Sequence, residues 1–166
     1  MKIILKVIFL LLLIPLLIFG QQENPYLSSL YKSLSEAKSD TARMKAYSDL
    51  GSYYIPEDRD SANFYLEKAL PIAVNLNLKL DEASVLNKMG VIMMQQEKFS
   101  QSLKFYLKAL NIAKDPSIEK NIWNLSPGQN ARSARLLEVS NSYDLIGILN
   151  AYSGNWTENI KNQMKN

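Results

Sequence analysis

The sequence predicts an all-α protein built from antiparallel helix-turn-helix repeats, and three observations support this fold class. The segment Lys68 to Ala73 recurs almost unchanged as Lys108 to Ala113, forty residues later. A second pair, Leu50-Gly51 and Met89-Gly90, is separated by thirty-nine residues. Apolar residues recur at intervals of three and four, and no segment alternates as a strand would. Self-similarity at a period of about 20 to 50 residues indicates a repeat protein, which presents an extended surface rather than a catalytic pocket.

The first twenty residues differ in kind from the rest and predict export. Lys2 and Lys6 are the only charges there, a short apolar run follows, and Gly20 precedes a polar segment. This order is typical of a secretory signal peptide, so we expect residues 1–20 to direct the chain to the periplasm or cell envelope. The alternative is an uncleaved anchor that holds the protein in the inner membrane through residues 3–19.

The composition limits the classes of partner that the protein can bind. Loss of the two leader lysines lowers the formal net charge from +3 to +1, so the mature chain has no field that would attract nucleic acid. Contact with a membrane is expected only through residues 3–19, if they remain. Residues 21–25 form a polar spacer that ends in a proline, and residues 26–166 form the helical domain.

The apolar spacing places the helices in order along this domain. The two best repeats are expected at 40–79 and 80–116, with Asp40, either Asp60 or Ser61, and Asp81 as helix caps. Pro71 falls inside an expected helix and should kink it or shift its end. The expected apolar stripes cover 26–37, 44–55, 62–73, 83–93, 99–113, 136–149 and 156–164.

The period breaks after Pro116. Residues 117–131 are an irregular insertion, and a loop is expected at 126–130. Helical spacing returns from Arg132, and a turn at Ser153-Gly154-Asn155 is expected to separate two helices. Residues 132–166 then form a partial third repeat whose last helix is short and uncapped.

Helix pairs with a Leu-Gly in the first helix and small residues around an aromatic in the second resemble the tetratricopeptide repeat (TPR) family. That resemblance implies a short right-handed α-solenoid in which small residues allow close helix packing. We expect Gly90 to lie at such a close approach, with Tyr106 and Ala109 nearby. A third copy would match Gly147 to Gly90 at an offset of fifty-seven residues. The positions that define the repeats are Leu50, Gly51, Ala62, Ala69, Met89, Gly90, Ser102, Tyr106, Ala109, Gly147 and Trp156.

The resemblance also implies a binding surface on the first helices of the repeats. TPR domains that clamp a peptide carboxylate use Lys, Asn and Arg on this surface, and only Asn87 and Lys88 are similar here. We expect a protein or peptide groove lined by Ser48, Ser52, Asn87, Val91, Met94 and Gln95.

Two functions remain open after these observations. The first is a non-catalytic exported TPR scaffold that binds a protein or peptide. The second is a truncated sensor or input domain, resembling the front of a histidine-kinase-like or transcription-regulator-like signalling protein. An uncovered apolar face around Leu149, Trp156 and Ile160 at the C-terminal end would allow self-association.

Enzymatic chemistry is not expected. The chain has no His and no Cys, so a nucleophile–base pair or a Cys/His metal cluster cannot be built. The acidic turn at 57–60 lacks the spacing of a calcium loop and is interpreted as a helix start. We therefore predict no catalytic, cofactor-binding or metal-binding residues, and no cofactor.

Overall fold

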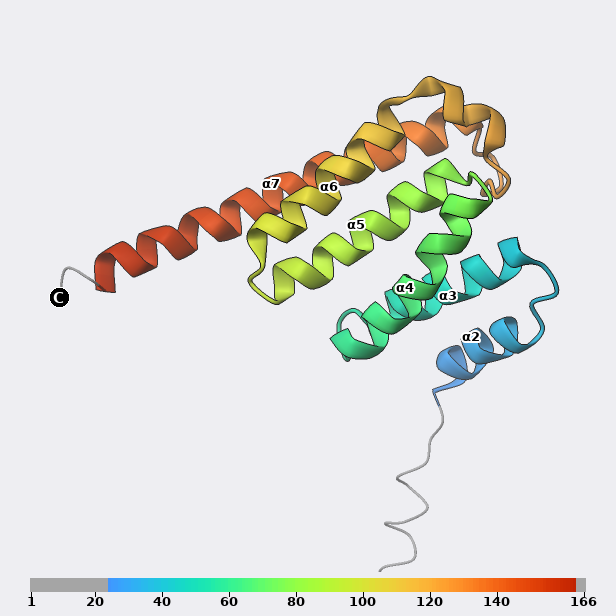
Figure 1. Ribbon diagram of the computed structural model, residues 1–166, viewed down its shortest axis with the longest axis horizontal. Helices are drawn as coiled ribbons and strands as arrows, with labels where there is room; N and C mark the ends of the chain where they lie inside the picture. The colour runs from blue at the N-terminus through green and yellow to red at the C-terminus, as the bar shows by residue number, and fades with distance from the viewer. Residues whose placement is uncertain (1–23, 164–166) are drawn as a thin grey trace, which may run out of the picture.

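The computed structural model describes the backbone of residues 24–163 and the side chains of residues 24–154. The expected leader at 1–20 and the side chains of Trp156 and Ile160 lie outside these limits. The described residues contain helices and no strand, which confirms the all-α class. The elements are α2 (Pro25–Ser35), α3 (Asp40–Tyr54), α4 (Arg59–Asn75), α5 (Lys79–Gln95), α6 (Phe99–Lys114), the 3-10 helix η1 (Pro116–Asn121) and α7 (Ala131–Gln163) (Figure 1).

Two of the expected helix caps were placed slightly too late in the sequence. Ser39 caps α3 in place of Asp40, and Asp58 caps α4 in place of Asp60 or Ser61. A capping residue must have extended backbone while its side chain accepts from the first turn. Ser39 (φ −120°, ψ 159°) and Asp58 (φ −142°, ψ 98°) meet this condition.

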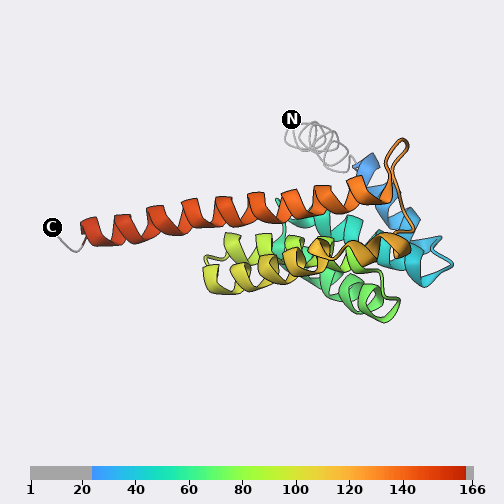
Figure 2. The same ribbon diagram turned by 90° about the horizontal axis from the view of Figure 1, so that it is seen from above.

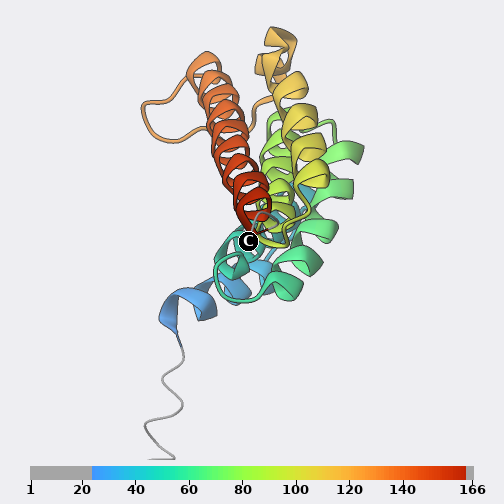
Figure 3. The ribbon, with the colours of Figure 1, turned by 90° about the vertical axis from the view of Figure 1, so that its left-hand side faces the viewer.

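Each helix packs against its neighbour in the chain, and alternate helices also touch. The pairs α3–α5 and α5–α7 are in contact, in addition to α3–α4, α4–α5, α5–α6 and α6–α7. Figure 3 shows α7 along one side of the molecule, with α6 and α4 toward the opposite side. The helices α3, α5 and α7 therefore form one layer, and α4 and α6 form the other.

Glycines make the contact within each helix pair close. A Cβ at Gly51 would lie 2.6 Å from the Leu66 side chain, and a Cβ at Gly90 would overlap the Tyr106 ring. Ser102 Oγ donates to the Gly90 carbonyl oxygen at 2.8 Å, so the same contact also satisfies a buried hydroxyl. The expected close approach of Gly90 and Tyr106 is confirmed.

Helix α2 is fixed to the first pair by tyrosines. The Tyr31 hydroxyl hydrogen-bonds with that of Tyr54 at 2.8 Å and accepts from that of Tyr65 at 3.2 Å. The rings of Tyr54 and Tyr65 stack with centroids 5.8 Å apart. Such ring pairs add to the stability that burial provides.

Helix α7 contradicts the expected turn at Ser153-Gly154-Asn155. It is one helix of 33 residues and passes through Gly154 without interruption (Figure 2). Glycine inside a helix costs only about 1 kcal/mol relative to alanine, and a single residue cannot end a long helix at that cost. Ser153 Oγ donates to the Asn150 carbonyl at 3.2 Å, a bond within the helix.

Pro71 and residues 117–131, where the sequence departs from the repeat, leave both helix layers intact. Helix α4 continues for four residues past Pro71, whose ring is exposed. Residues 117–131 form most of η1 and a loop in which Gly128 has a positive φ of 79°. None of the helices within residues 24–163 combines the length and the apolar character that crossing a bilayer requires.

Candidate functional site

The expected groove residues lie on two helices of one layer, and only some of them meet. Ser48 and Ser52 are on α3, and the others are on α5. Asn87 and Val91 line a cavity between α5 and α7. Ser48 contacts α5 through Lys88, while Ser52 Oγ donates to the Ser48 carbonyl within α3 at 2.8 Å.

Met94 and Gln95 lie farther along α5, outside the lining of the cavity. Met94 is half-buried and Gln95 is exposed. The Gln95 carbonyl accepts from Arg59 Nη1 at 3.0 Å, which ties the end of α5 to the start of α4. The structure thus concentrates the site around Asn87 rather than along the whole helix.

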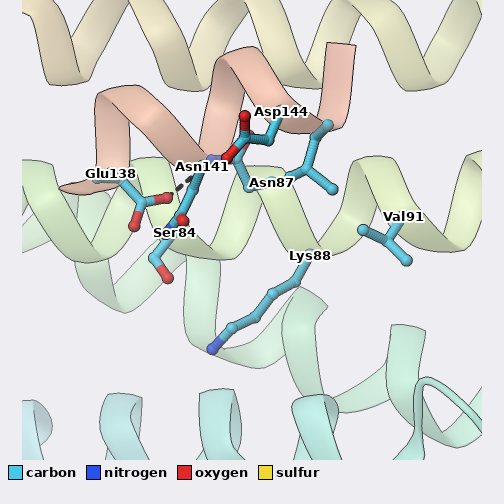
Figure 4. A pocket seen from close by; sticks show the side chains of 8 residues that line it. Ser84, Asn87, Lys88, Val91, Glu138, Asn141 and Asp144 are labelled. Atoms are coloured by element: carbon cyan, nitrogen blue, oxygen red, sulfur yellow. Dashed lines mark hydrogen bonds between the residues drawn. The ribbon is translucent and has the colours of Figure 1, made fainter. Parts of the chain in front are cut away.

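The cavity has a volume of about 290 Å³ and is built from matched positions of two helices. Ser84, Asn87 and Lys88 of α5 stand fifty-seven residues before Asn141, Asp144 and Leu145 of α7, the same offset that separates Gly90 from Gly147. Its lining is Ser84, Asn87, Lys88, Val91, Glu138, Asn141, Asp144 and Leu145 (Figure 4).

Asn87 joins the two helices at the back of the cavity. Its Nδ2 donates to Glu138 Oε1 at 2.7 Å and to Ser142 Oγ at 2.8 Å. Its Oδ1 is buried and has no hydrogen-bond partner. An unpaired buried acceptor costs about 1–3 kcal/mol, so this oxygen is a position where a donor would be stabilised.

Lys88 points to the opposite side, toward α3 (Figure 4). Its Nζ donates to Ser48 Oγ at 2.6 Å. Burial lowers the pKa of the Lys88 ammonium, an effect that the nearby carboxylates of Asp49 and Glu138 oppose. The lysine is therefore held against α3 by a neutral partner and does not form an ion pair within the described residues.

Two carboxylates in the layer are desolvated. Burial raises the pKa of Glu138, and hydrogen bonding from Asn87 and the charge of Lys88 oppose that rise. Burial also raises the pKa of Asp81, while a hydrogen bond from Trp123 acts in the other direction. Both groups are carboxylates whose charge is only partly compensated by the protein.

Trp123 is a site residue that sequence reasoning did not find. Its indole Nε1 donates to Asp81 Oδ2 at 2.9 Å, so Asp81 holds the loop and does not cap α5. A second cavity, of about 280 Å³, has Trp123 on one side and Lys45 and Asp49 of α3 on the other. No local pattern in residues 117–131 could have placed this ring, because a loop's path depends on what it packs against.

The surroundings of Gly147 differ from those of Gly51 and Gly90. A Cβ at Gly147 would meet nothing within 4 Å, so α7 has no close helix contact at this position. Leu149, expected on the open face, is buried, and the exposed apolar side chains of α7 include Leu136 and Tyr143. These two side chains lie on the same face of α7 as Gly147. The corresponding face of α5, which contains Gly90, is covered by α6.

The chemical groups around the cavity are of a few kinds only. Among residues 24–154, no group of three or more Asp or Glu side chains is arranged to hold a metal ion. The polar side chains in the cavity lining carry amides, a hydroxyl, carboxylates and the ammonium of Lys88, and Asn87 and Glu138 are joined across the contact between α5 and α7. No known protein family model matches the chain, and neither a curated protein nor a solved structure is detectably similar to it.

Proposed function

We propose that this protein is a non-catalytic, exported scaffold that binds a protein or peptide segment on the layer formed by α3, α5 and α7. The observation that carries the proposal is the cavity between α5 and α7, where side chains at matched helix positions face one shared space. The first helices of the repeats, α3, α5 and α7, lie parallel and present polar side chains at regular intervals. Such a surface suits an extended chain better than a compact substrate.

The finer fold assignment, a TPR-like right-handed solenoid, is part of this proposal. It is supported by the sequence offsets of thirty-nine and fifty-seven residues and by the buried glycine in each of the two complete helix pairs. In such an array, the first helices line the concave face and the second helices support them.

A peptide-display selection tests the proposed binding surface. Asn141 is exposed and lines the cavity, so Asn141→Trp should fill it without disturbing the core. Ser140 is exposed and is not part of the lining, so Ser140→Trp is the matched control. We expect selected peptides to bind the wild type and Ser140→Trp and to lose affinity for Asn141→Trp. Selection of no peptide that distinguishes the two variants would contradict the proposal.

Export remains a prediction from the leader. Cell fractionation followed by N-terminal sequencing should find the mature chain in the envelope and beginning near Gln21. Recovery from the membrane with the leader intact would favour the anchor formed by residues 3–19. Recovery of the full chain from the cytosol would exclude both arrangements.

The length of α7 favours a second candidate function, an input domain of a signal-transduction protein. Figure 2 shows α7 running on beyond the ends of α5 and α6, so one helix carries both the cavity wall and a projecting segment. Such a helix could connect ligand binding to an output module. Amide hydrogen exchange at residues 150–163 should then slow when a selected peptide is bound. Unchanged exchange there would argue against this candidate, while leaving the scaffold function intact.

A further inference from the structure

We propose that the cavity between α5 and α7 receives a cationic side chain, the ammonium of a lysine or the guanidinium of an arginine, from the bound segment. The inference rests on the proposed function, because it names the chemistry that the same groove recognises. It predicts a preference opposite to that of a TPR carboxylate clamp, for which a cationic surface would be needed.

The charges on the layer are divided unequally. Between α3 and α5, Lys45 pairs with Asp49 at 2.9 Å, and the charge of Lys88 is shared among Asp49, Glu138 and Asp81. The part between α5 and α7 adds Glu138 and Asp144 and no further cation. Neither of these carboxylates takes part in an ion pair within the described residues. With Lys88 as the one cation in its lining, the cavity has two carboxylates against one ammonium group, an excess of negative charge.

Lys88 lines the cavity and offsets part of the charge of Glu138, but its ammonium lies away from the α7 side. Its Nζ is committed to Ser48 Oγ at 2.6 Å, on the side of α5 that faces α3. Figure 4 shows Glu138 and Asp144 on the α7 side of α5, and Lys88 extending away from them. A ligand cation would lie on the α7 side and would meet carboxylates there first.

The unpaired oxygen of Asn87 gives an independent indication of a donor. Asn87 is 4% exposed, and both donor positions of its amide are used by Glu138 and Ser142. Its Oδ1 has no partner, although the residue lines the cavity. Because this oxygen has almost no exposed surface, a donor reaches it only when the Asn87 side chain turns toward the cavity. Lysine and arginine heads offer only donors, so they can then satisfy this oxygen and a carboxylate together.

The walls of the cavity also suit a long basic side chain. Val91 and Leu145 supply apolar surface beside the polar atoms. Lysine and arginine bury their methylene stems along apolar surface while the charged head reaches polar partners. A short acidic side chain would find neither the charge nor the length of contact that it needs here.

The test uses the full mature chain and short labelled Gly/Ser peptides that carry several lysines, glutamines or glutamates, with blocked ends. Fluorescence anisotropy should show the tightest binding for the lysine peptide, and spermidine should compete with it if a free amine is enough. In the double variant Glu138→Gln/Asp144→Asn, affinity for the lysine peptide should fall by about tenfold, which is the effect of losing one moderately strong interaction. The double variant Asp60→Asn/Glu67→Gln removes the same charge from α4 and should bind as the wild type does.

Equal binding of the three peptides, or an equal loss in both double variants, would overturn the inference. If display selection yields peptides that Asn141→Trp rejects but that contain no basic residues, the inference fails while the proposed function stands. If selection yields no groove-dependent peptide, the proposed function fails. Circular dichroism melting of each variant separates loss of binding from loss of fold.

Discussion

The two sides of α5 differ in how they meet their neighbours. Toward α6, Gly90 allows the Tyr106 ring to lie directly on the helix backbone, and the contact is closely packed. Toward α7, Asn87 forms hydrogen bonds to Glu138 and Ser142 beside a cavity of about 290 Å³. One helix therefore contributes stability on one side and the proposed binding surface on the other. Close packing leaves no space for a ligand, whereas a polar contact with a cavity does.

The largest expected effect comes from overpacking the α6 side. Gly90→Leu should lower the free energy of unfolding by about 1–3 kcal/mol, because the added side chain must displace Tyr106. Gly147→Ala is the matched control, since its Cβ would meet no atom within 4 Å and alanine favours a helix by about 1 kcal/mol. Chemical denaturation measures both. Stability of Gly90→Leu equal to that of the wild type would remove the distinction between the two sides.

The next effect concerns the polar link on the α7 side. Asn87→Ala removes the donors to Glu138 and Ser142 and should destabilise the protein by about 1–2 kcal/mol, because a partly buried carboxylate loses a hydrogen bond. Amide exchange should increase more in α7 than in α6. Equal increases in both helices would indicate that Asn87 supports the whole fold rather than the α5–α7 contact.

A smaller effect is expected from the desolvated lysine. The pKa of Lys88 is lower in the folded than in the unfolded chain, so the charged form weakens the folded state at pH values below that folded pKa. Lys88→Met should therefore be more stable than the wild type at neutral pH. The difference should shrink as the pH rises through the lowered pKa toward the ordinary value of 10.5. Thermal melts at neutral and alkaline pH test this sign, and a gap that grows with pH would contradict it.

The smallest expected effect is that of Glu138→Gln in the absence of ligand. Burial raises the pKa of Glu138, so the carboxylate costs stability above its folded pKa and this cost disappears as the pH falls through that pKa. Glutamine keeps an acceptor for Asn87 and carries no charge. The variant should melt slightly above the wild type at pH 7 and level with it in acid. A lower melting temperature at pH 7 would mean that the charge itself supports the α5–α7 contact.

The repeat pattern in the sequence was sufficient to predict the helical class and the contact at Gly90. Both depend on local features: apolar residues at helical spacing, and a glycine whose missing side chain must be matched by a large neighbour. The same register placed Asn87 and Val91 on the layer that contains the cavity. Local spacing determines which face of a helix a residue occupies, so these predictions needed no tertiary information.

Tertiary packing determined three features that local patterns could not: the length of α7, the burial of Leu149 and the path of the loop after η1. Helix α7 continues through Gly154 because a single weak helix former does not outweigh the helix on either side. Leu149 is buried rather than exposed, because its face depends on which neighbours α7 meets.

The path of residues 117–131 brings Trp123 to Asp81, forty-two residues away in the chain. The sequence by itself thus determined the helices, their repeat and the face on which a groove could form. The tertiary structure alone decided the partners across that groove, because the charges and hydrogen bonds that meet there come from α3, α5, α7 and a loop whose relative positions no local pattern specifies.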